Sequence, residues 1–162
     1  MPSASRGEFS IDIAASAQRV YELVADVSAM GERSPECDQA QWIDGATGPE
    51  VGARFRGHNH LGFLRWSTVC EVTSADPSKE FAFHVVDGKG RERTRWRYLI
   101  EGDETHARLT ESYEFVLCPL IARLAEAPIP RDRQLQRGIE QTVRRIKQAA
   151  ERSDSSRSLP QL

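Results

Sequence analysis

The chain has 162 residues, of which 28% are charged, and its net charge is −2. This length suits one domain, and the balanced charge argues against nucleic acid as the main partner. No apolar run is long enough to span a bilayer, and the N-terminus lacks the apolar core of a secretory signal. The cysteines Cys37, Cys70 and Cys118 are odd in number and widely spaced, as expected for reduced thiols. We therefore expect a cytoplasmic protein with no stable membrane insertion.

The first elements follow a small, polar segment, residues 1–6, which we expect to be frayed. Phe9, Ile11 and Ile13 alternate with polar residues and predict a half-buried strand. Ser16 is suited to cap the amphipathic helix that we predict over about 17–28.

The apolar period then changes to two. Turn residues such as Asp44-Gly45, Asp76-Pro77 and Asp87-Gly88 separate the alternating segments. Because most of these connections are short, neighbouring strands should pair as antiparallel hairpins. The predicted strands are 37–44, 53–60, 65–74, 80–87, 92–101 and 106–116.

A long amphipathic helix follows, over about 131–151. Its apolar stripe has helical spacing and consists of Leu135, Ile139, Val143, Ile146 and Ala150. Residues 117–124 have the pattern of a lead-in helix. The Ser-rich segment 153–162 predicts a disordered tail, which leaves 7–152 as the folded domain.

These elements predict an α+β fold. One face of an antiparallel sheet must be covered, and the long helix is the only predicted element large enough to cover it. We expect a curved sheet of six to seven strands around that helix. A curved sheet and a straight helix do not fit along their whole length, so a cavity should remain between them.

Several stretches resemble the START-like, or helix-grip, superfamily, and within it the bacterial polyketide cyclase/dehydrase and lipid-transport group. The resemblance covers roughly 8–150 and rests on VYELVAD (20–26) with Met30, SPE (34–36), WIDG (42–45), VGARFRG (51–57), RWSTV (65–69), WRY (96–98) and TESYE (110–114). It implies a hydrophobic small-molecule ligand. Such sequences often carry Trp where this one has Arg33, so we expect no aromatic ligand contact there; if the protein is an enzyme, Arg33 is a candidate contact at the cavity mouth.

His58 and His60 lie two residues apart and would share one face of a strand. Phe55 should mark the opposite, buried face, so both histidines are expected to point to solvent. No HExxH or CxxC spacing accompanies them. We therefore predict no metal site, and nothing in the sequence indicates a cofactor.

Strand alternation selects the residues of the cavity wall. Glu111 is unusual among them because it shares the apolar face with Leu109 and Tyr113, where a carboxylate is costly unless it is paired or protonated. A bulge or a nearby arginine would be the structural alternative. The predicted ligand-binding residues are Trp66, Thr68, Phe83, Trp96, Tyr98, Glu111 and Tyr113 on the strands, with Ile139 and Val143 on the helix.

Three functions remain open. The first is binding of a lipid or polyketide-like molecule for transport or sequestration. The second is a polyketide cyclase, aromatase or dehydratase using general acid–base catalysis, with Glu111, Tyr98 and Tyr113 as candidates. The third is a protein-interaction module, which a large exposed apolar patch would indicate. The chain is expected to be a monomer or a homodimer.

Overall fold

The N-terminal elements form as the sequence predicts, with one interruption. The structure, a computed structural model, describes residues 6–116 and 131–157. Strand β1 (Arg6–Ile13) leads into helix α1 (Ala17–Ala25), where Ser16 Oγ accepts a hydrogen bond from the Arg19 backbone N–H at 3.1 Å. The helix ends early because the carboxylate of Asp26 caps a new turn, η1 (Val27–Ala29), which runs into the short helix α2 (Met30–Arg33).

Seven antiparallel strands form one sheet in the order β1-β7-β6-β5-β4-β3-β2. The fold class is thus confirmed, and strand bounds agree with the prediction to within two residues. The register places Glu111 between Phe9 on β1 and Tyr98 on β6. The further strands are β2 (Cys37–Ile43), β3 (Arg54–Leu61), β4 (Leu64–Asp76), β5 (Glu80–Val86), β6 (Glu92–Gly102) and β7 (Ala107–Phe115).

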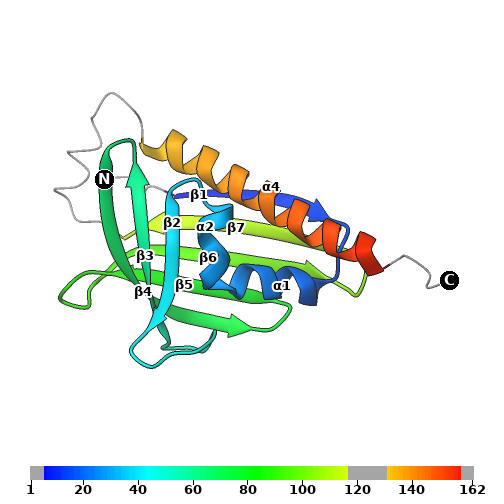
Figure 1. The fold of residues 1–162 in the computed structure, drawn as a ribbon, viewed down its shortest axis with the longest axis horizontal. Coiled ribbons are helices and arrows are strands. Elements are labelled where there is room, and N and C mark those ends of the chain that lie inside the picture. The colour runs from blue at the N-terminus through cyan, green and yellow to red at the C-terminus, as the bar shows by residue number, and fades with distance from the viewer. Residues whose placement is uncertain (1–5, 117–130, 158–162) are drawn as a thin grey trace.

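The sheet is strongly curved. Figure 1 shows β2, β3 and β4 running across the direction of β5, β6 and β7. Register shifts interrupt the pairing between Cys37 and Gln39 on β2 and between Val72 and Ser74 on β4. Such β-bulges increase the local twist and bend the strand, which lets the sheet curl.

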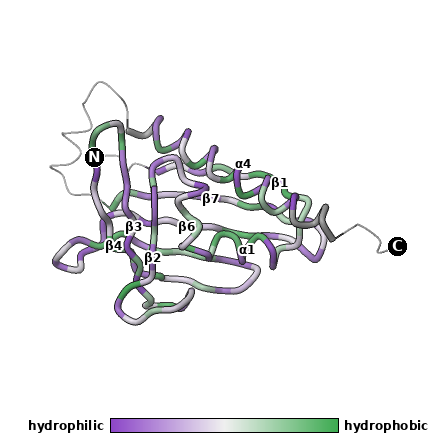
Figure 2. Tube along the Cα trace, viewed as in Figure 1, coloured by the Kyte–Doolittle hydropathy of each residue, from purple (hydrophilic) through white to green (hydrophobic). Residues whose placement is uncertain are grey.

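Helix α4 (Arg131–Arg157) lies along β1 and β7 and also contacts α1 (Figure 1). Hydrophobic and hydrophilic residues alternate along it (Figure 2), and its apolar stripe is buried as predicted. The helix continues past the domain boundary predicted at residue 152, to Arg157. The predicted frayed end, apart from Arg6, and the lead-in helix 117–124 lie outside the described residues, as does 158–162.

The outer surface of the described residues is mostly polar. On the convex face, Arg95 pairs with Glu92 at 2.6 Å, and His84 lies 3.3 Å from the same carboxylate. Phe63 and Leu64 are exposed at the β3–β4 turn. Within the described residues, no helix combines the length and the apolar character needed to cross a membrane.

Candidate ligand cavity

A cavity of about 510 Å³ lies between the concave face of the sheet and the first half of α4. Residues of α4 from Gln134 to Thr142 line it, whereas Val143 and Ile146 are buried in the core together with Leu109. The first half of α4 also packs on β1 and β7, where Leu135 and Ile139 cover Tyr113 and Gln136 Nε2 donates to the Glu8 carbonyl oxygen at 3.0 Å. The cavity lies beside this contact, between the helix and the concave face of β3 to β6.

Most of the residues predicted from strand alternation line this cavity. They are Trp66, Thr68, Phe83, Trp96, Tyr98, Glu111 and Ile139. That these side chains contact a ligand stays a prediction.

Tyr113 and Val143 do not line the cavity, which corrects their expected position. Tyr113 does lie on the concave face, but Leu135 and Ile139 cover it, and its ring packs against Trp96 at 5.7 Å between centroids. Val143 is fully buried one turn beyond Ile139, in the main core cluster. Both residues belong to the core.

Glu111 lies at the inner end of the cavity. It and Tyr98 are the last lining residues of β7 and β6 before the core residues Leu109 and Ile100. Its side chain is 3% exposed, and burial raises its pKa from 4.5 to about 8, against a smaller lowering by Tyr98. The carboxyl group is thus largely protonated at neutral pH. No bulge turns it outward, so the predicted inward orientation agrees with the structure.

The two carboxyl oxygens of Glu111 have different environments. Oε1 accepts a hydrogen bond from the Tyr98 hydroxyl at 3.0 Å. Oε2 is buried and has no hydrogen-bond partner within the described residues. A buried polar atom without a partner is costly, so Oε2 is the position where a ligand atom or a water would be stabilised.

Arg33 does not form part of the cavity mouth. Its guanidinium donates a hydrogen bond to the carbonyl oxygen of Leu23, and its own carbonyl oxygen accepts one from Arg145 at 3.2 Å. Burial lowers the pKa of Arg33, and the charge of Asp26 partly offsets this. Arg33 therefore joins α1, α2 and α4 behind the cavity wall, because the chain turns inward after η1.

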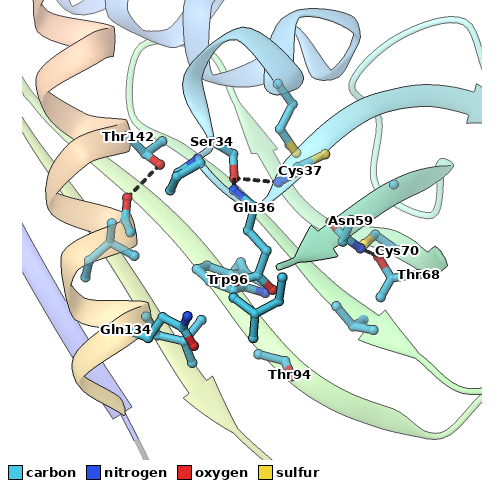
Figure 3. Close-up of a pocket in the computed structure, with 18 of the residues that line it drawn as sticks. Ser34, Glu36, Cys37, Asn59, Thr68, Cys70, Thr94, Trp96, Gln134 and Thr142 are labelled. Carbon is cyan, nitrogen blue, oxygen red and sulfur yellow. Dashed lines mark hydrogen bonds between the residues drawn. The ribbon is translucent and has the colours of Figure 1, made fainter. Parts of the chain in front are cut away.

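Polar residues at the mouth were not predicted. Glu36, Asn59, Gln134, Arg137 and Gln141 line the opening, and Figure 3 shows Glu36 reaching from the segment before β2 toward Trp96. These residues belong to a loop, to a strand end or to the polar side of α4. In the sequence they look like ordinary solvent-facing residues, so no sequence signal distinguishes them from the rest of the polar surface.

His60 borders the cavity at the end of β3, but its side chain is 37% exposed, in line with the expected solvent-facing orientation. The bulge in β2 changes the pairing at this end of β3, and the His60 backbone N–H donates to the Glu36 carbonyl oxygen at 2.9 Å. The ring Nδ1 lies 2.7 Å from Asp38 Oδ1. His58 is exposed as predicted, and its Nδ1 lies 3.0 Å from Ser67 Oγ.

The cavity has neither a metal-ligand cluster nor a reactive thiol among the described residues. No group of three or more His, Cys, Asp or Glu side chains is suitably arranged for a metal ion within 6–116 and 131–157. Cys37 and Cys70 are free thiols, and burial raises the pKa of Cys70 to about 12. A thiol with so high a pKa is a poor nucleophile at neutral pH.

Solved structures of similar fold come from several bacteria. A Polyketide_cyc-like protein from Corynebacterium glutamicum is 33% identical, with 96% of this chain and 94% of that chain covered and a TM-score of 0.60. The Zhui aromatase/cyclase from a Streptomyces species is 17% identical, covers 93% and 95%, and has a TM-score of 0.63. A START superfamily protein from Mycobacterium smegmatis is 16% identical, covers 86% and 99%, and has a TM-score of 0.57. A search of curated proteins found no match.

Together, the seven-stranded curved sheet, the C-terminal helix and these neighbours define a START-like helix-grip protein. The chain belongs to the polyketide cyclase/dehydrase and lipid-transport family, whose family model matches residues 6–151.

Proposed function

We propose that the protein binds a hydrophobic small molecule, a lipid or a polyketide-like compound, inside this cavity, for transport or sequestration in the cytoplasm. The observation that carries the proposal is a cavity of about 510 Å³ with a mainly apolar and aromatic interior and one buried carboxyl group at its inner end. Ligand sites commonly combine an apolar wall with a few placed polar groups. Family membership supports the same ligand class.

A fluorescent probe tests the proposal. N-phenylnaphthylamine is apolar and brightens when it leaves water, so parent protein should raise its emission. Val85 lines the cavity, and Val85→Trp should fill part of it and weaken probe binding at least tenfold. Val69 lies on the opposite face of β4, so Val69→Trp is the matched control and should bind like the parent. Equal binding by both variants, or none by the parent, would contradict the proposal.

General acid–base catalysis in the same cavity is the second candidate function. It is favoured by the Glu111–Tyr98 pair, because a carboxyl group with a pKa of about 8 can donate and accept a proton near neutral pH. The similar fold of an aromatase/cyclase is consistent with this activity. In that case the acid or base is Glu111, held in position by Tyr98.

One variant separates the two functions. Glu111→Gln keeps the shape of the side chain and a hydrogen-bonding amide but cannot transfer a proton. If the protein is a carrier, Glu111→Gln should retain most of the ligand binding, and no turnover is expected from either protein. If the protein is an enzyme, Glu111→Gln should bind a synthetic poly-β-keto thioester as tightly as the parent does but should no longer catalyse its cyclisation or dehydration. Mass spectrometry of the product measures this reaction.

A further inference from the structure

The two oxygens of Glu111 are not equivalent, and their hydrogen bonding favours one position for its proton. Tyr98 uses its single hydroxyl proton to donate to Oε1. In a neutral carboxyl group the carbonyl oxygen accepts better than the hydroxyl oxygen, so the bond from Tyr98 to Oε1 favours the form with the proton on Oε2. That oxygen is buried and unpartnered within the described residues, and Glu111 lines the cavity. The inner end of the cavity thus offers one O–H donor.

The cationic groups that line the cavity lie elsewhere. Among the described residues, the basic residues of the lining are His60 and Arg137; Arg137 is exposed, and the His60 ring lies beside exposed Asp38, so both lie on the solvent side of the cavity. Arg33 acts electrostatically on Tyr98 from behind the wall and does not line the cavity. An anionic ligand end at Glu111 would therefore lose its hydration without meeting a cation in the cavity, and it would repel an ionised carboxylate.

We infer that the cavity selects hydrophobic ligands whose inner end is an uncharged hydrogen-bond acceptor, such as a ketone, ester or amide carbonyl, and that Glu111 Oε2–H donates to it. This inference rests on the proposed ligand-binding function and names the ligand class for it. A carbonyl oxygen satisfies the one unpartnered donor and brings no charge into the apolar interior.

The same arrangement predicts a pH dependence. The titratable and charged groups around Glu111 are Tyr98 on β6, Cys37 on β2 and Cys70 on β4, with Glu36, His60 and Arg137 at the mouth and Arg33 behind the wall. Of these, Tyr98 hydrogen-bonds Glu111 directly. Burial places the pKa of Glu111 at about 8, so above that pH the donor is lost. Carbonyl binding should then weaken.

Two ligands of equal chain length test the inference, with displacement of N-phenylnaphthylamine as the readout. At about pH 6.5, methyl nonyl ketone should bind the parent at least tenfold more tightly than undecanoate, which is ionised there. Glu111→Leu removes the donor and should weaken ketone binding at least fivefold, while undecanoate still meets no cation and should bind no more tightly than to the parent. Glu114 lies on the outer face of β7, and Glu114→Gln should retain the full preference.

Glu111→Gln provides an arm that does not depend on how well the leucine variant folds. Its amide still donates a hydrogen bond but does not titrate. From about pH 6.5 to about pH 9.5, the ketone affinity of the parent should fall at least fivefold and that of Glu111→Gln should stay constant. The inference would be overturned if undecanoate bound the parent as tightly as the ketone does, or if ketone affinity fell equally with pH in the parent and in Glu111→Gln. In either case, binding of the probe would leave the proposed function standing. Failure of the parent to bind either ketone or probe would overturn both.

Discussion

The Tyr98 hydroxyl lies 3.0 Å from Oε1 of Glu111, at the inner end of an otherwise apolar cavity. The two residues face each other across the β6–β7 ladder, so strand register alone brings them together. Burial, and then the charge of Glu111, raise the pKa of Tyr98. Burial also raises the pKa of Glu111, and the hydrogen bond from Tyr98 moderates that rise. The pair is a neutral hydrogen-bonded unit at neutral pH.

The raised pKa of Glu111 predicts how stability depends on pH. Below about pH 4.5 the group is protonated in both the folded and the unfolded chain and costs nothing. As the pH rises to about 8, the unfolded chain releases this proton while the folded protein keeps it, so the free energy of unfolding falls. Glu111→Gln should therefore match the parent near pH 4.5 and exceed it at pH 9 by up to roughly 5 kcal/mol, since each pH unit between the two pKa values is worth about 1.4 kcal/mol.

Urea denaturation at the two pH values measures this difference. Glu114→Gln is the control, because Glu114 is half-exposed on the outer face and its 3.7 Å contact with Arg95 is a surface ion pair. The control should show no comparable gain at pH 9. A Glu111→Gln protein less stable than the parent at pH 9 would mean that the carboxylate is paired in solution.

Removal of the Tyr98 hydroxyl should shift the titration of Glu111. Because the hydrogen bond from Tyr98 lowers the pKa of Glu111, Tyr98→Phe should raise it further. Carbon-13 NMR of the Glu111 carboxyl carbon follows this titration directly. The same change should cost about 1–2 kcal/mol of stability, because Oε1 also loses its partner. An unchanged or lower pKa would show that Tyr98 does not donate to Glu111.

The attachment of α4 to the sheet depends on its buried stripe. Ile139 is 2% exposed, so Ile139→Asp places an unpaired charge in the core and should cost roughly 3 kcal/mol or more, or prevent folding. Gln148 is exposed on the same helix, and Gln148→Asp should change stability by about 0.5 kcal/mol at most. Thermal unfolding of both variants distinguishes a packed helix from a loosely attached one.

The expected absence of a transition metal is a separate prediction. His58 is exposed and contacts Ser67, and His60 lies beside Asp38. Elemental analysis of tag-free protein should find less than stoichiometric zinc and iron. Stoichiometric metal in the parent that disappears in His58→Ala would refute this prediction.

The sequence predicted the elements well because each has a clear period and clear turn residues. Alternation along β7 also placed Glu111 on the concave face. Alternation does not reveal which residues of the concave face are covered by side chains of α4. Tyr113 and Glu111 have the same parity, yet Leu135 and Ile139 cover Tyr113 and leave Glu111 open to the cavity. That difference depends on where the side chains of α4 lie over β7.

The mouth was harder to predict for another reason. Arg33 was expected there because of its place in the sequence, but its guanidinium turns inward to the Leu23 carbonyl. His60 was assigned to solvent by strict alternation, and its ring does lie beside the exposed Asp38, but the bulge in β2 also brings this end of β3 to the edge of the cavity. Bulges and inward turns are set by tertiary packing, so a periodic pattern in one sequence does not reveal them.

A crystal structure of the protein soaked with a bromine-labelled long-chain methyl ketone tests the central claim most directly. Anomalous scattering locates the bromine, and the electron density locates the carbonyl group. The account predicts a ketone inside the cavity between α4 and the sheet, with its carbonyl oxygen within hydrogen-bonding distance of Glu111 Oε2. A ketone bound only on the outer surface, or one bound in the cavity with its carbonyl at the mouth beside Arg137, would contradict it.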